Sequence, residues 1–543
     1  MTPAVSRTRL LQLGLAAAGA LLVAPRVALA QLRAPSLARL SVRNRGRQYF
    51  GDRRLFASVS PGVPGRDTAS VAFSLDRPAT VRLEAVRTAL RKRTTVWQTE
   101  QFFDVGYHRL WWRPNEKTAV GSYVMRLTVE DEAGNLKSYG GSRPAKASRS
   151  RTPVVRILGV EAAFDKRSYA PLEPAQLTIT ADAERITLQF LACGTEAEYT
   201  DRTDEMRGQP IGPPLSYGWS RKRSAPHTIV VNPGAWVSGV YAAKLTTDDG
   251  RVGFAPLILR PASLGTVRQA VVMPTNTWQA YNFDDSDGDG WGDTWYAGGN
   301  PPVKLSRPYR QRGTPPWFRR SDVPFLKFLH QTGRTPDVLA DDDLEAFPSG
   351  DELRRLYDLV VFPGHTEYVT EHAYDVVQRF RDLGGRLIFL TANNFFWKVE
   401  KNGPWMRRMK LWRDLGRPEA ALIGAQYRAN DNGTKQGVYN IVDTAGAPWL
   451  FEGTGLVNGS TLGEMVGGYG IEIDSTTPFS PPGTRVLAQI PNLFGPGLTG
   501  EMTYYETEQG ARVFCAGALD FSGSITFQPV WRMLDNLWHH MTS

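Results

Sequence analysis

The chain has 543 residues, of which 41% are hydrophobic and 22% are charged. These proportions exclude a disordered chain, and the length predicts three or four domains of about 150 residues each. The formal net charge is +10, but no nucleic-acid-binding motif accompanies it, so we expect no nucleic-acid partner. Arginines scattered through the first 150 residues are interpreted as solvated surface, with attraction to an anionic cell envelope as the alternative.

The N-terminus has the pattern of a signal peptide over residues 1–30. Arg7 and Arg9 precede an apolar run at 10–23, and a small-x-small cleavage site ends the segment. The two arginines, separated by a threonine, resemble an imperfect twin-arginine signal. We therefore expect a mature chain that begins at Gln31 and is periplasmic or secreted. The apolar run is too short to span a membrane, and no transmembrane segment is expected in the mature chain.

Two β-sandwiches are predicted after the signal segment. Residues 36–150 alternate apolar and polar side chains in short bursts separated by turns, and 153–262 repeat the arrangement. The closing stretch at 239–250 mirrors the one at 121–134. Short strands at this spacing predict immunoglobulin-like sandwiches, joined by a basic linker at 142–152. Neither sandwich carries a concentrated chemical motif, so a spacer or a platform facing a carbohydrate or a partner is expected.

Residues 266–543 change to strands that alternate with helices. Buried strands are predicted at 269–273, 356–364, 385–390 and 510–517, and helices at 322–333, 370–383 and 529–541. This alternation predicts an α/β domain with a parallel sheet, of flavodoxin or glutaminase type. Cys193 and Cys515 fall in different predicted domains without CxxC spacing. A thiolate metal site is therefore not expected, and a single disulfide between the two cysteines stays open.

Polar side chains follow two of the predicted parallel strands. His365 and Glu367 come after the second strand, and Asn393 and Asn394 after the third. Ligands of such sheets bind beyond the carboxyl ends of the strands. The first pair could form a metal site, a general acid and base, or a loop contact. The asparagines could donate to an oxyanion or cap a turn. No nucleophile elbow or phosphate-binding loop is present.

The loop after the first parallel strand is rich in acids and aromatics. Asp at relative positions 1, 3, 5 and 9, with Gly at 6, matches the first part of a calcium-binding loop: Asp285, Asp287, Asp289, Asp293 and Gly290. The glutamate expected at position 12 is replaced by Tyr296. The sequence leaves two interpretations of this loop open, a calcium-binding site and a flexible acidic turn.

Several motifs occur in a characteristic order. They are Gln279-Ala280-Tyr281-Asn282, Gly292-Asp293-Thr294-Trp295-Tyr296, Ser306-Arg307-Pro308-Tyr309, Gly364-His365-Thr366-Glu367-Tyr368, Ala392-Asn393-Asn394-Phe395-Phe396-Trp397 and Tyr504-Tyr505-Glu506-Thr507. Together they resemble the catalytic domain of the large (β) subunit of N,N-dimethylformamidase. The resemblance covers roughly residues 266–541.

This resemblance implies a mononuclear Fe³⁺ site with two tyrosine phenolates and one glutamate. On matching positions the ligands are Tyr281, Tyr296 and Glu367, with Tyr309 as the competing second phenolate. Hard anionic oxygens suit a ferric ion, which would act as a Lewis acid.

The same resemblance implies that Glu506 is the general base or nucleophile, and that His365 and Asn393 polarise or orient the substrate. The chain departs from the family pattern in its Asp-rich expansion between the two tyrosines and in Val369, where relatives often have Trp. These departures point away from dimethylformamide itself as the substrate.

Three functions are consistent with the sequence. The leading hypothesis is an exported iron-dependent amidohydrolase, acting on a carbon–nitrogen bond of a small or peptide-like amide, with a small subunit or a homo-oligomer as partner. The first alternative is a non-catalytic cell-envelope protein that binds carbohydrate or a partner. The second is a glycoside hydrolase that uses Glu367 and Glu506 as a carboxylate pair.

Overall fold

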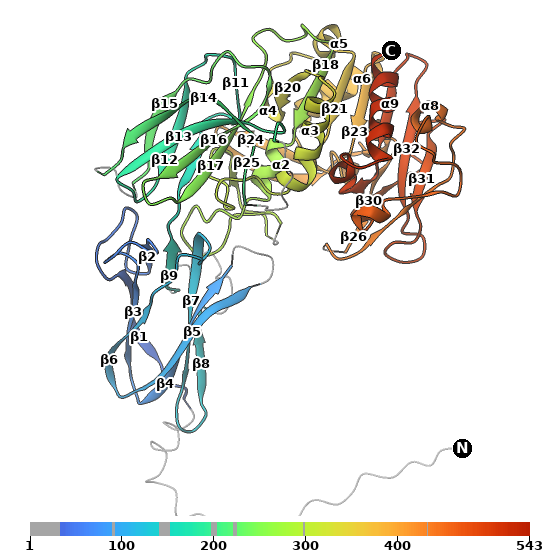
Figure 1. Cartoon of the computed structure of the whole chain (residues 1–543). Helices are drawn as coiled ribbons and strands as arrows, with labels where there is room; N and C mark the ends of the chain where they lie inside the picture. The colour runs from blue at the N-terminus through green and yellow to red at the C-terminus, as the bar shows by residue number, and fades with distance from the viewer. Residues whose placement is uncertain are drawn as a thin grey trace, which may run out of the picture.

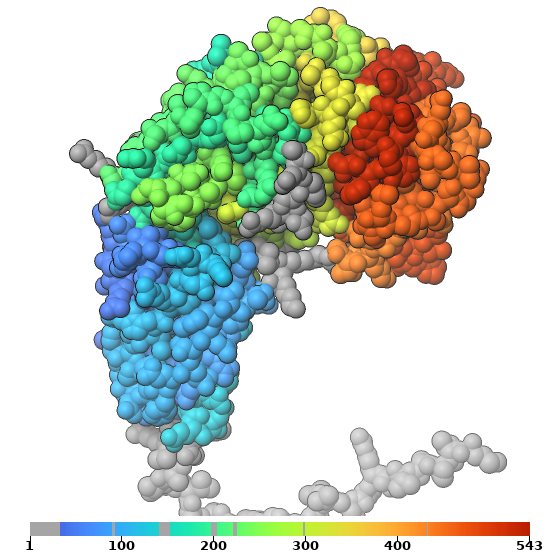
Figure 2. Space-filling view, in the orientation of Figure 1, coloured from blue at the N-terminus to red at the C-terminus, as the bar shows by residue number. Residues whose placement is uncertain are grey.

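The computed structural model describes residues 33–88, 93–140, 152–196, 204–220, 225–296, 299–431 and 433–543. The predicted signal peptide and residues 142–151 of the predicted linker lie outside this part of the chain. In Figure 1 a first β-sandwich lies at the end of a larger body, which is formed by a second sandwich and an α/β unit side by side. Figure 2 shows the first sandwich in blue, projecting from that body.

The first sandwich consists of two sheets of mostly antiparallel strands, which pack against one core. One sheet has the order β1 (Leu37–Asn44), β3 (Ala69–Leu75), β6 (Gly106–Trp112). The other has the order β2 (Phe56–Val59), β9 (Val154–Ile157), β7 (Gly121–Glu130), β4 (Ala79–Arg87), β5 (Thr94–Phe103), with β8 (Leu136–Tyr139) beside β7. Strand β9 follows the predicted linker, and yet it pairs with β2 and β7 of this sandwich.

The second sandwich has the same two-layer design. Its sheets are β10 (Glu161–Phe164), β12 (Ala175–Thr180), β15 (His227–Val231), and β11 (Ser168–Tyr169), β17 (Val252–Leu259), β16 (Gly239–Thr247), β13 (Arg185–Ala192), β14 (Gln209–Gly218). Strand β12 alternates buried Ala175, Leu177 and Ile179 with more exposed polar residues, as a half-buried strand requires. The predicted tandem of sandwiches is thereby confirmed.

The α/β unit is built on a nine-stranded mixed sheet. Its order is β20 (Asp337–Ala340), β18 (Gln269–Met273), β21 (Leu359–Phe362), β23 (Arg386–Phe389), β33 (Arg512–Cys515), β32 (Gly500–Glu506), β31 (Arg485–Ile490), β28 (Tyr439–Ile441), β29 (Thr461–Leu462). The first five strands are parallel, as predicted, and the remaining strands extend the sheet antiparallel. The chain order of the parallel strands is 2-1-3-4-5, so the connections reverse direction between β18 and β21.

Helices cover both faces of this sheet. They are α2 (Thr275–Ala280), α3 (Val323–Gln331), α4 (Asp341–Leu344), α5 (Gly350–Leu356), α6 (Glu371–Asp382), α7 (Ala420–Ile423), α8 (Pro448–Phe451) and α9 (Val530–Thr542). Single helical turns occur at Arg413–Leu415, Glu464–Val466 and Phe521–Ser524, and a π-helical turn at Phe318–Asp322. Side chains on one face of β18 pack with α3 and α9, and those on the other pack with α5 and α6.

Two small sheets complete the unit near the carboxyl ends of the parallel strands. One has the order β19 (Val303–Lys304), β25 (Trp405–Leu411), β24 (Trp397–Asn402), β22 (Tyr368–Val369). In the other, β30 (Tyr469–Ser475) pairs with β26 (Gln426–Asn430), β27 (Gln436–Gly437) and β34 (Ala518–Leu519).

The helices expected from the sequence are present. Helix α6 begins after Thr370, whose side chain accepts a hydrogen bond from the backbone N–H of Ala373, a typical N-cap. Cys193 and Cys515 are both buried and both free, so they form no disulfide. Within the described residues, no helix combines the length and apolar character that crossing a membrane requires.

The three units are joined by buried contacts. Phe254 and Ile258 of β17 belong to the same core as helix α3. Glu161 of the second sandwich pairs with Arg156 of β9 and, at 3.3 Å, with Arg310 of the α/β unit. One buried carboxylate therefore connects all three units.

Candidate active site

The candidate site lies at the point where the sheet connections reverse. Strand β18 runs into helix α2, which ends at Tyr281, and β21 runs into the loop that carries His365 and Glu367. Asp341, beyond β20, accepts a hydrogen bond from the backbone N–H of Asn276 at 2.7 Å. Thr277 Oγ1 accepts one from the N–H of Glu367 at 3.1 Å. These contacts hold three strand ends in one place.

The loops after β21 and β23 are joined by backbone hydrogen bonds. The N–H of Phe395 donates to the carbonyl of Thr366 at 2.7 Å, and the N–H groups of Phe396 and Trp397 donate to the carbonyl of Glu367 at 3.0 and 2.9 Å. Strands β22 and β24 continue this pairing in parallel. The spacing between Glu367 and the loop that carries Asn393 is therefore set by the backbone.

The two asparagines of this second loop have different roles. The Asn394 amide donates to the carbonyl of Thr391 at 2.9 Å and accepts from its hydroxyl at 3.0 Å, so Asn394 caps the turn. Asn393 has a φ of 58°, in the left-handed region that asparagine tolerates better than most residues. Its side chain faces the site instead.

Four side chains meet at the centre of the site. The Tyr281 hydroxyl donates to a carboxylate oxygen of Glu367. His365 Nε2 lies 3.3 Å from Glu367 Oε2 and 3.6 Å from Glu472 Oε2. The sequence-predicted Tyr281, His365 and Glu367 are thus brought together, all of them buried.

Glu472 is the site residue that sequence reasoning missed. It lies on β30, and its Oε2 accepts a hydrogen bond from Asn393 Nδ2 at 2.9 Å. The preceding residue, Ile471, has a φ of 66°. The only sequence signal was a pair of acids, Glu472 and Asp474, two positions apart in an apolar strand.

Glu506, expected as the general base, is placed elsewhere by the structure. It is exposed at the end of β32, where it accepts a hydrogen bond from Tyr504 at 2.5 Å and lies 3.9 Å from His540. It pairs in register with Arg512, at the start of β33. That is the amino end of a parallel strand, whereas the site lies at the carboxyl ends. The structure therefore places Glu506, one member of the Glu367–Glu506 pair expected for a glycoside hydrolase, outside the cavity that Glu367 lines.

Two phenols neighbour Tyr281. The ring of Tyr296 is 5.2 Å from that of Tyr281, and the ring of Tyr368 is 5.8 Å away, between centroids. Burial and the Glu367 carboxylate raise the pKa of both Tyr281 and Tyr368 well above the ordinary value. Tyr309, the competing candidate, does not line this cavity and lies near Arg167 and Gln279.

The central side chains line a cavity of about 200 Å³. Its remaining walls are largely aromatic, from Trp295, Trp317, Phe396, Trp397 and Tyr427, with Arg408 as a cationic member. Burial would lower the pKa of His365, but Glu367 and Glu472 outweigh it and raise that pKa to about 9. Burial also raises the pKa of the Glu472 carboxyl. The site concentrates charge in a place from which water is largely excluded.

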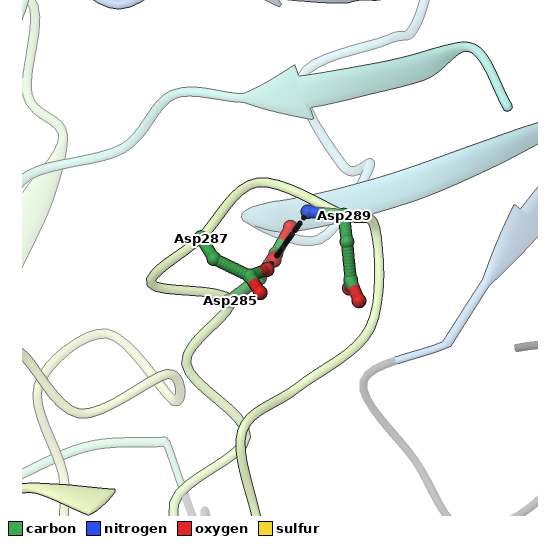
Figure 3. A group of neighbouring side chains, drawn as sticks. All are labelled: Asp285, Asp287 and Asp289. Carbon is green, nitrogen blue, oxygen red and sulfur yellow. Dashed lines mark hydrogen bonds between the residues drawn. The ribbon is translucent and has the colours of Figure 1, made fainter. Parts of the chain in front are cut away.

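The Asp-rich loop forms a separate cluster. Asp285, Asp287 and Asp289 offer carboxylate oxygens within 4.8 Å of one another, close enough to share one cation (Figure 3). Asp293, expected as a fourth ligand, is not part of this group, and its carboxylate accepts from the N–H of Ser286 at 3.1 Å. Burial raises the pKa of Asp285 to about 7.

This loop rests on the first sandwich. Arg53 Nη2 donates to the carbonyls of Asp287 and Gly288, both at 3.0 Å, and the Thr88 hydroxyl donates to the carbonyl of Gly290. The acidic loop therefore forms a contact between the α/β unit and the first sandwich.

Comparison with known proteins gives one family. Residues 216–536, more than half of the chain, match the model of the family described as N,N-dimethylformamidase beta subunit-like, C-terminal. The N,N-dimethylformamidase beta subunit of an Alcaligenes species is 25% identical over 320 residues, which cover 48% of this chain and 41% of that protein. The one from Paracoccus aminophilus is 24% identical over the same extent. The match thus spans less than half the length of these relatives.

Solved structures were also matched. CBD12 from CALX1.2 is 11% identical, with a TM-score of 0.15, and covers 38% of this chain and 81% of its own. The Yersinia pseudotuberculosis adhesin InvE is 12% identical, with a TM-score of 0.16, and covers 42% of this chain and 60% of its own.

A buried aspartate behind the site predicts a pH dependence of stability. Asp322 accepts from Trp278 Nε1 at 3.0 Å, and burial raises its pKa to about 7, against about 3.9 in an unfolded chain. Ionisation therefore favours the unfolded chain, so this group costs stability as pH rises from about 4 through 7. The Asp322→Asn variant lacks this cost. Its unfolding free energy relative to the wild type should therefore be about 2 kcal/mol higher at pH 8 than at pH 5.

Denaturant titrations at both pH values measure this difference. Asp351→Asn is the control, because this carboxylate is exposed and its hydrogen bond with Arg379 holds its pKa below the ordinary value. An equal pH 5 to pH 8 difference in wild type and in Asp322→Asn would contradict the prediction.

Proposed function

Because this chain belongs to the N,N-dimethylformamidase beta subunit-like family, we propose that it hydrolyses the carbon–nitrogen bond of a small or peptide-like amide. The observation that carries the proposal is the buried cluster of Tyr281, His365, Glu367, Asn393 and Glu472 in one cavity, at the reversal point of the sheet. Ligand sites of open α/β sheets occur at such points. A spacer or binding platform has no need for this much buried charge, which disfavours the non-catalytic alternative.

The donors at the centre fit Fe³⁺. The Tyr281 hydroxyl already contacts the Glu367 carboxylate, and a second phenol stands beside it. Phenolate and carboxylate oxygens are hard anionic ligands, which suit a hard trivalent ion. We propose Tyr281, Tyr296 and Glu367 as the ligands, with Tyr368 as the competing phenol. When bound, the ion would supply Lewis-acid polarisation of the amide carbonyl and lower the pKa of water.

The protein groups around this centre have distinct tasks. Glu472 accepts the proton of the attacking water and passes it to the departing amine, as a general base and then a general acid. Asn393 Nδ2 holds Glu472 Oε2 in place, at 2.9 Å. His365 anchors through Nδ1 to the carbonyl of Ala392 at 3.1 Å, with Nε2 between the two glutamates. It therefore sets the separation of Glu367 and Glu472.

The ferric site predicts a coloured protein. Iron-replete wild type should show a visible phenolate-to-iron band, and Tyr281→Phe and Glu367→Ala should each lose the iron. Tyr296→Phe and Tyr368→Phe show which of the two tyrosines is the second ligand. Only the substitution of a true ligand should shift or abolish the visible band. Metal analysis and a visible spectrum on one preparation measure this. A colourless wild type, or full iron content in both Tyr281→Phe and Glu367→Ala, would contradict the assignment.

The proposed base predicts a contrast between two glutamates. Glu472→Gln keeps the size and the amide contact, so iron should stay bound while kcat falls by about 10²-fold or more. Glu506→Gln is the matched control and should keep wild-type turnover, because Glu506 is exposed and outside the cavity. Steady-state hydrolysis of a simple formamide measures both. Loss of activity in Glu506→Gln with Glu472→Gln intact would reverse the assignment.

For the separate Asp-rich cluster we propose Ca²⁺, held by Asp285, Asp287 and Asp289. Three close carboxylates repel one another, and a divalent cation removes that repulsion only in the folded chain. Millimolar Ca²⁺ should raise the unfolding temperature of the wild type, and the rise should vanish in Asp287→Asn. Asp104→Asn, in the first sandwich, is the control. An equal effect of Ca²⁺ on all three proteins would refute a specific site.

We also propose that the chain is exported, with residues 1–30 as its signal. N-terminal sequencing of the protein from its native host would show a start at Gln31.

A small subunit or a second copy of the chain is the proposed partner, because the relatives are named as subunits. Mass measurement of the purified complex decides between them.

A further inference from the structure

A second cavity adjoins the candidate active site. Its volume is about 290 Å³, and it shares Tyr281, Tyr296 and Trp317 with the first cavity. The two cavities therefore meet at these three aromatic side chains, and the first cavity holds the proposed chemistry. Trp317 has a φ of 66°, a strained backbone conformation of the kind that persists at functional sites. The second cavity is called the arginine chamber below.

The charged side chains that line the arginine chamber are all cationic. They are Arg87, Arg310, Arg319 and Arg320. Arg310 pairs with Glu161 at 3.3 Å, Arg319 with Glu196 at 2.8 Å and Arg320 with Asp520 at 2.7 Å. Each of these three charges is already balanced by a carboxylate.

Arg87 is different. Among the described residues it has no carboxylate within ion-pair distance, and its buried Nε has no hydrogen-bond acceptor. Arg310 Nε and the fully buried Thr314 hydroxyl likewise lack a partner there. Partly desolvated donors without acceptors are costly, and native proteins usually satisfy them. Their convergence on one cavity indicates an acidic ligand.

The rest of the chamber wall is apolar. Phe283, Pro316, Trp317 and Phe318 line it, with the amides of Asn282 and Gln311. A ligand that fills the chamber would thus have an apolar body and an anionic end. The guanidinium of Arg87, whose Nε has no acceptor, has the planar geometry that matches the two oxygens of a carboxylate.

The first sandwich contributes Arg87. This residue ends β4, whereas the other lining residues belong to the α/β unit. Arg310 Nη2 also lies 3.5 Å from the Ser122 hydroxyl of β7. The chamber is therefore closed by two units of the chain.

We propose that the arginine chamber binds the carboxylate end of the substrate, and that the substrates are amides that carry a carboxylate, of the N-acyl amino acid type. The reacting amide lies in the first cavity, and the apolar side chain and carboxylate lie in the arginine chamber, past the Tyr281, Tyr296 and Trp317 rings that line both cavities. This inference rests on the proposed amide hydrolysis and names its substrate class.

The test compares two probes of equal size, N-formylphenylalanine and its uncharged C-terminal amide. Wild-type kcat/KM should be at least tenfold higher for the carboxylate probe. Arg87→Gln should lower that value about 10- to 100-fold and lower the value for the uncharged probe far less, since hydrogen bonds between charged groups are stronger than those to a neutral amide. Arg87→Lys should restore part of the preference. Arg82→Gln, on the same strand but exposed and paired with Glu100, should behave as wild type.

A binding measurement separates this inference from the proposed function. Titration calorimetry measures the binding of N-formylphenylalanine to folded Glu472→Gln and to Glu472→Gln/Arg87→Gln. Because both variants lack the proposed base, binding to the arginine chamber is measured without turnover. Arg87-dependent binding without hydrolysis in wild type would support the chamber and reject the amidohydrolase. Hydrolysis of both probes at equal rates, or an Arg87→Gln variant that loses both equally, would overturn the chamber.

Discussion

The hydrogen bond from Tyr281 to Glu367 is the contact on which the site depends. It joins the chain after β18 to the chain after β21, across the one place in the sheet where the connections reverse. The connections lead to opposite faces of the sheet at this point, so side chains from both sides can approach one another. Because both partners are buried, the loss of either would remove a hydrogen bond from a polar group that has little access to water.

Backbone geometry gives this contact its rigidity. The loops that carry Glu367 and Asn393 are paired as if they were strands, and several non-glycine residues near the site have a left-handed backbone, namely Trp317, Asn393, Phe395, Ile471 and Asp520. Conformations of this kind cost free energy and persist where the surrounding structure enforces them. In this protein the surroundings are two cores that cover both faces of the sheet. The stability of the whole unit therefore supports a site that is locally unfavourable.

The sequence predicted the parts of the fold that depend on local patterns. Apolar runs such as 269–273 and the helical spacing over 370–383 are local signals, and the corresponding elements are present. The antiparallel half of the sheet was not foreseen, because its strands, such as β31, alternate apolar and polar side chains only weakly. Glu472 was missed because only the folding of β30 against the loop of Asn393 brings it to His365. Glu506 was misplaced because a motif match carries no information about which end of a strand faces the site.

The junction at Glu161 has a consequence for how such chains diversify. This carboxylate binds Arg156 from the first sandwich and Arg310 from the α/β unit, and Arg310 also lines the arginine chamber. An N-terminal module held in this manner is part of the pocket wall rather than a tether. Recombination that exchanged the module between relatives would then alter which molecules are admitted, while the catalytic groups stayed untouched. Evolution could in this way vary selectivity and chemistry on separate pieces of one gene.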